Sequence, residues 1–172
     1  RSLLSLLSAA GPLPSGQIVT LPYRPNVCML LYNPKFELWI GERFGASTWQ
    51  FPQGGVEPDI SPQENVIREL CEELGLEKRH LGKILALEAT HRYDFWHTPP
   101  HWKERWRGQE QTFWAVQFLG RDQDIDVSRH QPQEFQRGTW CPPDLVLERV
   151  EPIRRAGYQK PIREYLNRIA LL

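Results

Sequence analysis

The apolar positions of this chain form short continuous runs separated by turn residues. Residues 27–32 read VCMLLY, an unbroken apolar run that is consistent with a buried strand. Asn33-Pro34-Lys35 is a turn signal, and the pattern resumes over residues 37–40, so the two runs predict a hairpin. Further extended segments are expected at 49–51, 84–93, 112–118 and 138–141.

One amphipathic stretch carries start and stop signals for a helix. Ser61 is a good N-cap, Pro62 fits the first helical position, and Glu64 completes a capping box. Gly75 ends the helix as a C-terminal glycine would. Two more helices are expected at 143–149 and 160–172, the latter with an apolar stripe of Ile162, Tyr165, Leu166 and Ile169. Because strands and helices do not alternate regularly, the pattern favours an α/β sandwich over a doubly wound parallel sheet.

The length and composition are those of one globular domain. With 172 residues, 40% of them apolar, the chain is not expected to be disordered. We expect a flexible N-terminal extension over residues 1–20 and one domain over 21–172. Lys+Arg and Asp+Glu balance at 21 each, so overall charge predicts neither a nucleic-acid nor a membrane partner.

Two further features concern the cellular compartment. No apolar run is long enough to span a bilayer, so no membrane partner is expected. The cysteines are odd in number and scattered, which favours a reducing cytoplasm over a disulfide framework: Cys28, Cys71 and Cys141.

The helix that follows Ser61 carries three carboxylates on one face. With about 100° per residue and Glu69 at zero, Glu72 and Glu73 fall near −60° and +40°. The apolar residues of the helix cluster on another face, so one side can be buried while the other presents the carboxylates. Since like charges on adjacent turns are destabilising, Arg68 or a divalent cation is expected to offset them. A solvated acidic face without metal is the other interpretation.

The loop before this helix begins with Gly54 and Gly55. Glycine lets the backbone bend sharply and approach a ligand closely. A glycine pair alone is weak evidence, but a glycine pair that leads into a capped helix with this acidic spacing is far more specific.

Residues 54–76 resemble the Nudix box, in which a glycine and a short loop precede Arg-Glu-Leu-x-Glu-Glu-x-Gly-hydrophobic. Here the second half reads RELCEELGL without a gap. The resemblance implies the Nudix fold, a mixed β-sheet between helices, and hydrolysis of a nucleoside diphosphate linked to another group. It extends to a branch that holds bacterial RNA pyrophosphohydrolases and plant-type dinucleoside tetraphosphate hydrolases, through YRPNV (23–27), ERFGASTWQFPQGG (42–55), GQEQTFW (108–114) and QEF (133–135).

The same resemblance implies roles for the acidic residues. Glu69 and Glu73 are expected to bind Mg²⁺ or Mn²⁺, and Glu72 to act as a ligand or a base. A backbone carbonyl at Gly54 completes the coordination in relatives. In this branch a glutamate at the position of Glu134 reaches the metal cluster as an extra ligand or general base, an ordinary loop acid being the alternative.

One position departs from the box. The glutamate expected six residues after the first glycine is replaced by Ile60. In the family that glutamate braces the loop and pairs with the box arginine, here Arg68. Glu64 is the first candidate for a substitute, and the loop acids Glu57 and Asp59 are the others. We therefore expect Ile60→Glu to raise the rate or the metal affinity, unless the loop has settled into a different arrangement.

Four polar residues are candidates for the substrate side of the site. Arg24 and Arg43 match positions that face the substrate phosphates or base in the branch, with surface ion pairs as the alternative. Gln109 and Gln111 flank the start of a strand, where they either line the cleft or face solvent.

Aromatic residues are candidates to bind a nucleobase. Tyr93 and Tyr158 can stack on a base, although packing in the core is the alternative for each. The segment 91–108 is rich in Trp, His and Arg, and we interpret it as a mobile loop over the substrate. Its histidines, His91, His97 and His101, fit no zinc spacing.

The main hypothesis is a Mg²⁺-dependent hydrolase that acts on 5′-triphosphorylated RNA ends and releases pyrophosphate. A dinucleoside polyphosphate such as diadenosine tetraphosphate is the alternative substrate. From another class of protein, a catalytically weak nucleotide or RNA sensor that keeps the fold is the rival, and Ile60 is the feature that permits it.

Overall fold

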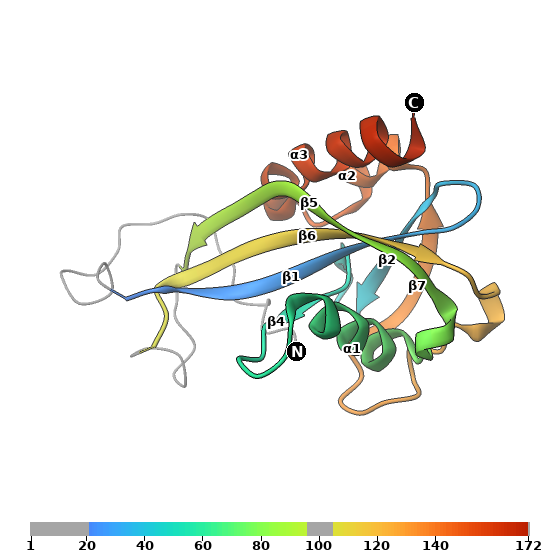
Figure 1. Ribbon diagram of the computed structural model, residues 1–172, viewed down its shortest axis with the longest axis horizontal. Helices are drawn as coiled ribbons and strands as arrows, with labels where there is room; N and C mark the ends of the chain where they lie inside the picture. The colour runs from blue at the N-terminus through green and yellow to red at the C-terminus, as the bar shows by residue number, and fades with distance from the viewer. Residues whose placement is uncertain (1–20, 96–104, 172) are drawn as a thin grey trace.

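The computed structural model describes residues 21–95 and 105–171, and these form a mixed β-sheet with helices on both faces (Figure 1). The sheet has the order β3-β2-β1-β6-β5, while β4 pairs with β1 and β7 pairs with β2. β1 and β6 are parallel and the other pairs are antiparallel. The strands are β1 (Tyr23–Tyr32), β2 (Leu38–Arg43), β3 (Trp49–Gln50), β4 (Gln53–Gly55), β5 (Leu81–Asp94), β6 (Gly108–Phe118) and β7 (Phe135–Cys141).

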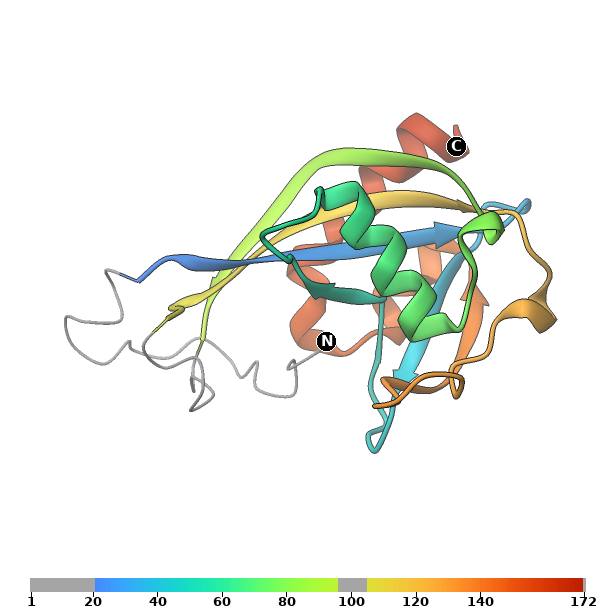
Figure 2. The same cartoon turned by 60° about the horizontal axis from the view of Figure 1, so that its bottom comes forward.

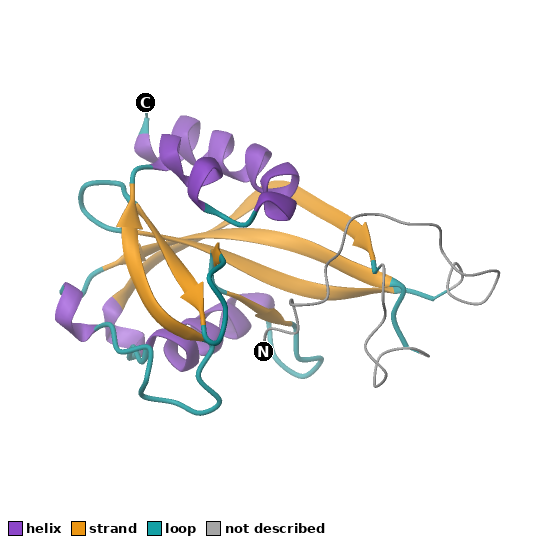
Figure 3. Cartoon of the chain, turned by 180° about the vertical axis from the view of Figure 1, so that it is seen from behind, coloured by secondary structure: helices purple, strands orange, loops and turns teal. Residues whose placement is uncertain are grey.

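Helix α1 (Pro62–Leu74) covers one face of the sheet and α3 (Arg155–Tyr165) covers the other, as the view from behind also shows (Figure 3). The predicted mixed sheet between helices is therefore confirmed. No helix in the described part of the chain is long and apolar enough to cross a membrane. The shorter helical segments are α2 (Val146–Arg149), the 3-10 turns Lys78–His80, Asp122–Asp124, Pro143–Leu145 and Pro152–Arg154, and a π-helical turn Leu166–Ala170.

Strand β1 lies in the middle of the molecule and buries both of its faces. Val27, Met29 and Leu31 pack in the cluster beneath α1, whereas Cys28 and Leu30 pack in the cluster beneath α3. A strand covered on both sides reads as a continuous apolar run rather than an alternating one. This explains VCMLLY, and the predicted hairpin with β2 is confirmed by the pairing of Tyr32 with Leu38.

The signals at both ends of α1 also work as predicted. Glu64 N–H donates to Ser61 Oγ at 3.1 Å and Ser61 N–H donates to Glu64 Oε2 at 3.4 Å, which is a complete capping box. Gly75 has a left-handed φ of 65°. The helix is thus fixed in register, which determines the direction in which each glutamate points.

Several elements begin earlier than the hydrophobic pattern indicates. β1 starts at Tyr23 instead of residue 27 because its polar first residues pair with β6 from Gly108 onward. Backbone ladders need no apolar side chains, so such extensions leave no hydrophobic signal. The last helix likewise starts at Arg155 instead of residue 160. The expected flexible extension at residues 1–20 lies outside the described residues.

Candidate active site

The sheet and α1 bring the four predicted glutamates to one cavity. Glu69, Glu72 and Glu73 of α1 line it with Glu134, which lies in the loop just before β7. The cavity has a volume of about 200 Å³. β7 pairs with β2, and Phe44 N–H donates to Glu134 O at 2.8 Å, so the pairing of two strands carries Glu134 to the helix.

Two of these carboxylates are buried, which is unusual for charged groups. Glu69 is 2% exposed and Glu73 is 4% exposed. Burial, and then the neighbouring carboxylates of Glu69 and Glu134, raise the pKa of Glu73 well above its usual range. Burial also raises the pKa of Glu69. The interpretation as a solvated acidic face is therefore wrong for these two residues.

The donor set fits a divalent cation. Both carboxylate oxygens of Glu73 are buried without a hydrogen-bond partner among the described residues, a costly arrangement that a bound cation would relieve. Carboxylate oxygens are the ligands preferred by Mg²⁺ and Mn²⁺. Within residues 21–95 and 105–171, no three acidic, His or Cys side chains already stand in a coordinating arrangement.

The two box glycines act by making room, and not by bending the chain. Both lie in β4, and neither has a positive φ. A Cβ on Gly54 would lie 2.3 Å from Glu69 Cδ, and a Cβ on Gly55 would lie 1.8 Å from Arg24 Nη2. Each glycine thus leaves space for one charged group, Gly54 for a carboxylate and Gly55 for a guanidinium.

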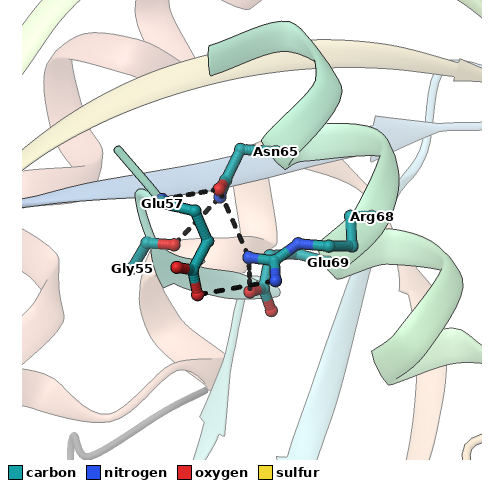
Figure 4. A network of polar contacts seen from close by, with 5 residues as sticks. All are labelled: Gly55, Glu57, Asn65, Arg68 and Glu69. Atoms are coloured by element: carbon teal, nitrogen blue, oxygen red, sulfur yellow. Dashed lines mark hydrogen bonds and ion pairs between the residues drawn. The ribbon is translucent and has the colours of Figure 1, made fainter. Parts of the chain in front are cut away.

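Arg68 connects the loop to the carboxylates, as Figure 4 shows. Its Nη2 donates to Glu69 Oε1 at 3.2 Å and its Nη1 lies 3.5 Å from Glu57 Oε1. Glu57, which was one of the alternatives, therefore pairs with Arg68. The prediction that Glu64 does so is wrong, because the Glu64 carboxylate caps the helix at Ser61.

Asn65 is the residue in this network that the sequence reasoning missed. It is fully buried, and its amide contacts the loop and Arg68 at the same time. A signal was present in the sequence. Asn65 lies about 40° from Glu69 on the helical wheel, on the carboxylate face, and asparagine is a poor residue for a helix interior.

Arg24 lies in a second cavity that adjoins the first. This cavity, of about 340 Å³, is lined by Arg24, Gly55, Glu57, Arg68, Glu69 and Glu72. Arg24 Nη1 donates to Gln109 Oε1 at 3.2 Å, and Gln109 Nε2 donates to the Tyr93 hydroxyl. Arginines beside the carboxylates suit a polyphosphate, whose charge is opposite to theirs.

The two candidate glutamines are buried, so of the two alternatives left open by the sequence, the one in which they face solvent is wrong. Gln109 is 2% exposed and Gln111 is 4% exposed. Gln111 Nε2 donates to Gln53 Oε1 at 2.7 Å and to Asn26 Oδ1 at 3.1 Å. Gln111 thus links β6 to β1 and β4, and Gln109 links β6 to Arg24 of β1.

Tyr93 and Arg43 are two of the three remaining substrate-side candidates, and burial shifts the pKa of each. Tyr93 is half-buried, and burial raises its pKa to about 12, so its hydroxyl stays protonated. Arg43 is half-buried near Glu134 and Glu151, and burial followed by the nearby Arg154 lowers its pKa. The prediction of a loop over residues 91–108 is wrong at its two ends, because residues 91–94 belong to β5 and Gly108 begins β6. Residues 96–104, with His97 and His101, lie outside the described residues.

Tyr158 is a core residue, and its prediction as a base-stacking residue is wrong. It is 1% exposed, its ring packs 4.5 Å from that of Phe51, and its hydroxyl accepts from Phe51 N–H at 3.2 Å. α3 can approach the sheet closely here because Gly157 has no side chain. A Cβ at this position would lie only 2.6 Å from His91 Cδ2. No face of the ring is open to a ligand.

We expect Tyr158→Leu to lower the free energy of unfolding by about 2 kcal/mol, because it removes a buried ring and leaves Phe51 N–H unpaired. The KM for substrate should stay within about twofold, as for a change that touches no ligand. Urea unfolding and steady-state kinetics measure the two effects. A raised KM with unchanged stability would restore Tyr158 as a stacking residue.

Comparisons with known proteins agree with this geometry. A family model described as NUDIX domain matches residues 22–161. An RNA pyrophosphohydrolase of Roseobacter denitrificans is 36% identical over 146 residues, which cover 83% of this chain and 91% of that protein. An RNA pyrophosphohydrolase of Rickettsia prowazekii is 32% identical over 155 residues, covering 88% and 94%.

Solved structures share the fold at lower identity. An Ap4A hydrolase from C. elegans has a TM-score of 0.60 at 16% identity, covering 86% of this chain and 99% of that one. A MutT protein from Methanosarcina mazei Go1 has a TM-score of 0.58 at 21% identity, covering 84% and 96%. At these identities the likeness concerns the fold alone.

Proposed function

Because the chain belongs to the NUDIX domain family, we propose that it is a hydrolase of 5′-triphosphorylated RNA ends that releases pyrophosphate. The observation that carries the proposal is the cavity where buried Glu69 and Glu73 meet Glu134, next to a second cavity that contains Arg24. The names of the curated relatives, which are similar over most of this chain, support RNA as the substrate.

The proposed cofactor is Mg²⁺, with Mn²⁺ as a substitute. Nudix hydrolases generally use divalent metal ions, and Glu69, Glu73 and Glu134 would hold them here, with Glu72 and the carbonyl of Gly54. A bound cation would neutralise phosphate charge and make a water nucleophilic. The free thiols of Cys28, Cys71 and Cys141 are in keeping with the proposed cytoplasmic location.

The side chains of the protein have separate tasks in this proposal. Arg24 and Arg43 hold phosphate oxygens, and Tyr93 offers a ring to the terminal base. Glu134 or Glu72 accepts the proton of the attacking water. A P–O–P anhydride bond of the triphosphate breaks, water adds across it, and the products are pyrophosphate and a 5′-monophosphorylated RNA.

A direct competition of substrates tests the proposal. Triphosphorylated RNA and diadenosine tetraphosphate are each supplied with Mg²⁺ or Mn²⁺, and the products are separated by chromatography. We expect faster turnover of the RNA, with pyrophosphate and monophosphorylated RNA as products. Faster turnover of diadenosine tetraphosphate would reassign the substrate. If neither is hydrolysed, and Glu73→Gln behaves like the wild type, the protein is a nucleotide or RNA sensor.

A further inference from the structure

Position 60 leaves the loop between β4 and α1 without its usual carboxylate. Ile60 is half-buried, and its hydrocarbon side chain can accept no hydrogen bond. The loop therefore needs another attachment to α1, and Arg68 needs another acceptor. Both needs arise next to Glu69, a residue proposed to bind the cation.

The Asn65 side chain satisfies both needs from inside α1. Its Oδ1 accepts from Glu57 N–H at 2.9 Å and from Arg68 Nη2 at 3.3 Å, while its Nδ2 donates to Gly55 O at 2.9 Å. Figure 4 shows these contacts converging on one amide. A carboxylate could accept the first two bonds but could not donate the third. The amide thus fastens both the end of β4 and the loop to the helix.

Glu57 completes the arrangement on the outer side. Its Oε1 lies 3.5 Å from Arg68 Nη1, and Arg68 Nη2 continues to Glu69 Oε1 at 3.2 Å. The Glu57 side chain is 58% exposed, so this ion pair contributes little by itself. The buried Asn65, which is 0% exposed, provides the rigid part of the brace.

We propose that Asn65 is a positioning residue that, together with Glu57, replaces the box glutamate and holds Arg68 against Glu69. The inference rests on the proposed function only in that Glu69 binds the cation. Asn65 lines neither of the two cavities. It acts by keeping the Arg68 guanidinium and the β4 backbone in place around the Glu69 carboxylate.

The test measures cation affinity without any substrate. Mn²⁺ binding is followed by electron paramagnetic resonance for the wild type, for Asn65→Ala and for Gln63→Ala, an exposed position in the same helical turn. We expect Asn65→Ala to weaken Mn²⁺ binding about 10- to 100-fold, as losses behind metal ligands do. Gln63→Ala should match the wild type. Equal affinities of Asn65→Ala and wild type would overturn the proposal.

A second pair of variants tests Glu57 without disturbing the core. Glu57→Gln and Asp59→Asn each remove one charge from the same exposed loop. We expect Glu57→Gln to weaken Mn²⁺ binding by up to about fivefold, the effect of one exposed ion pair, and Asp59→Asn to weaken it less. Equal losses would mean that the loop charge acts at a distance, which contradicts the assigned contact. This pair remains decisive if Asn65→Ala does not fold.

The final arm is rescue by the missing glutamate. The sequence alone predicts that Ile60→Glu raises the metal affinity, but the Asn65 and Glu57 contacts change that expectation. In the wild type, where the brace already exists, we expect Ile60→Glu to change Mn²⁺ affinity by less than about twofold. In the Asn65→Ala variant, the added Ile60→Glu substitution should recover most of the lost Mn²⁺ affinity, because a carboxylate at position 60 can then hold Arg68 in place of Asn65. If the effects of Asn65→Ala and Ile60→Glu on Mn²⁺ affinity are simply additive, Asn65 does not replace the box glutamate. Since no arm uses RNA, the brace and the RNA substrate can fail independently.

Discussion

Replacing Glu73 with glutamine is expected to lower kcat roughly 10²- to 10⁴-fold, as loss of a group essential to the chemistry does, while the metal-free protein becomes more stable to heat. Glutamine has nearly the same shape as glutamate and carries no charge. The buried position therefore remains filled, but the carboxylate proposed to hold the cation is lost.

The expected gain in stability follows from the surroundings of Glu73. Its carboxylate is 4% exposed, both oxygens are buried without a hydrogen-bond partner among the described residues, and Glu69 and Glu134 act on it unfavourably. An uncompensated buried charge is expensive, and an amide costs less to bury. We expect the metal-free variant to gain about 1–3 kcal/mol in the free energy of unfolding.

Calorimetry in EDTA and in excess Mg²⁺ measures the expected change in stability. The wild type should show a higher Tm with Mg²⁺ than with EDTA, because a ligand that binds the native state stabilises it. The Tm of Glu73→Gln should respond much less to Mg²⁺. Glu148→Gln, at an exposed site on α2, is the matched control. A lower Tm of Glu73→Gln in EDTA would show that the carboxylate is structural.

The second large effect is expected from Gly54→Ala, which should lower kcat/KM about 100-fold, the typical result of moving a reacting group by about 1 Å. A Cβ at this position would lie 2.3 Å from Glu69 Cδ and 2.5 Å from Glu69 Oε2. The carboxylate is buried beside β4, so relief of the clash moves it away from the cavity that it shares with Glu73 and Glu134.

Gly55→Ala is the matched control, since it adds the same methyl group one residue further along β4. Strand β4 is the short strand beside α1 in Figure 2. There the Cβ would meet Arg24 Nη2 at 1.8 Å, and the end of a long side chain can move aside. We expect Gly55→Ala to raise KM with little change in Mn²⁺ affinity, and Gly54→Ala to weaken Mn²⁺ binding. If both variants lose Mn²⁺ affinity equally, the two glycines do not have separate tasks.

The local features of the fold could be predicted because their causes lie close together in the sequence. The capping box of α1 joins Ser61 to Glu64, three residues away, and Gly75 follows the last turn directly. The apolar run of β1 likewise indicates a strand that is covered on both faces. Where an element extends through backbone pairing alone, as at the start of β1, no side-chain pattern marks it.

Contacts between distant segments could not be predicted in this way. Tyr158 resembles any aromatic residue of an amphipathic helix, and only the packing of α3 on the sheet places its ring beside Phe51. Gln109 lies at a strand start that could equally face solvent, and the pairing of β6 with β1 brings it to Arg24.

For this protein the sequence alone determined the helix, its register and the spacing of Glu69, Glu72 and Glu73, because these depend on the repeat of one helix. The tertiary structure decided that Glu69 and Glu73 are buried, that Glu134 joins them, and that Asn65 and Glu57 contact Arg68. Burial and the pairing of groups far apart in the chain depend on what the rest of the fold brings against a residue, and a local pattern does not contain that information.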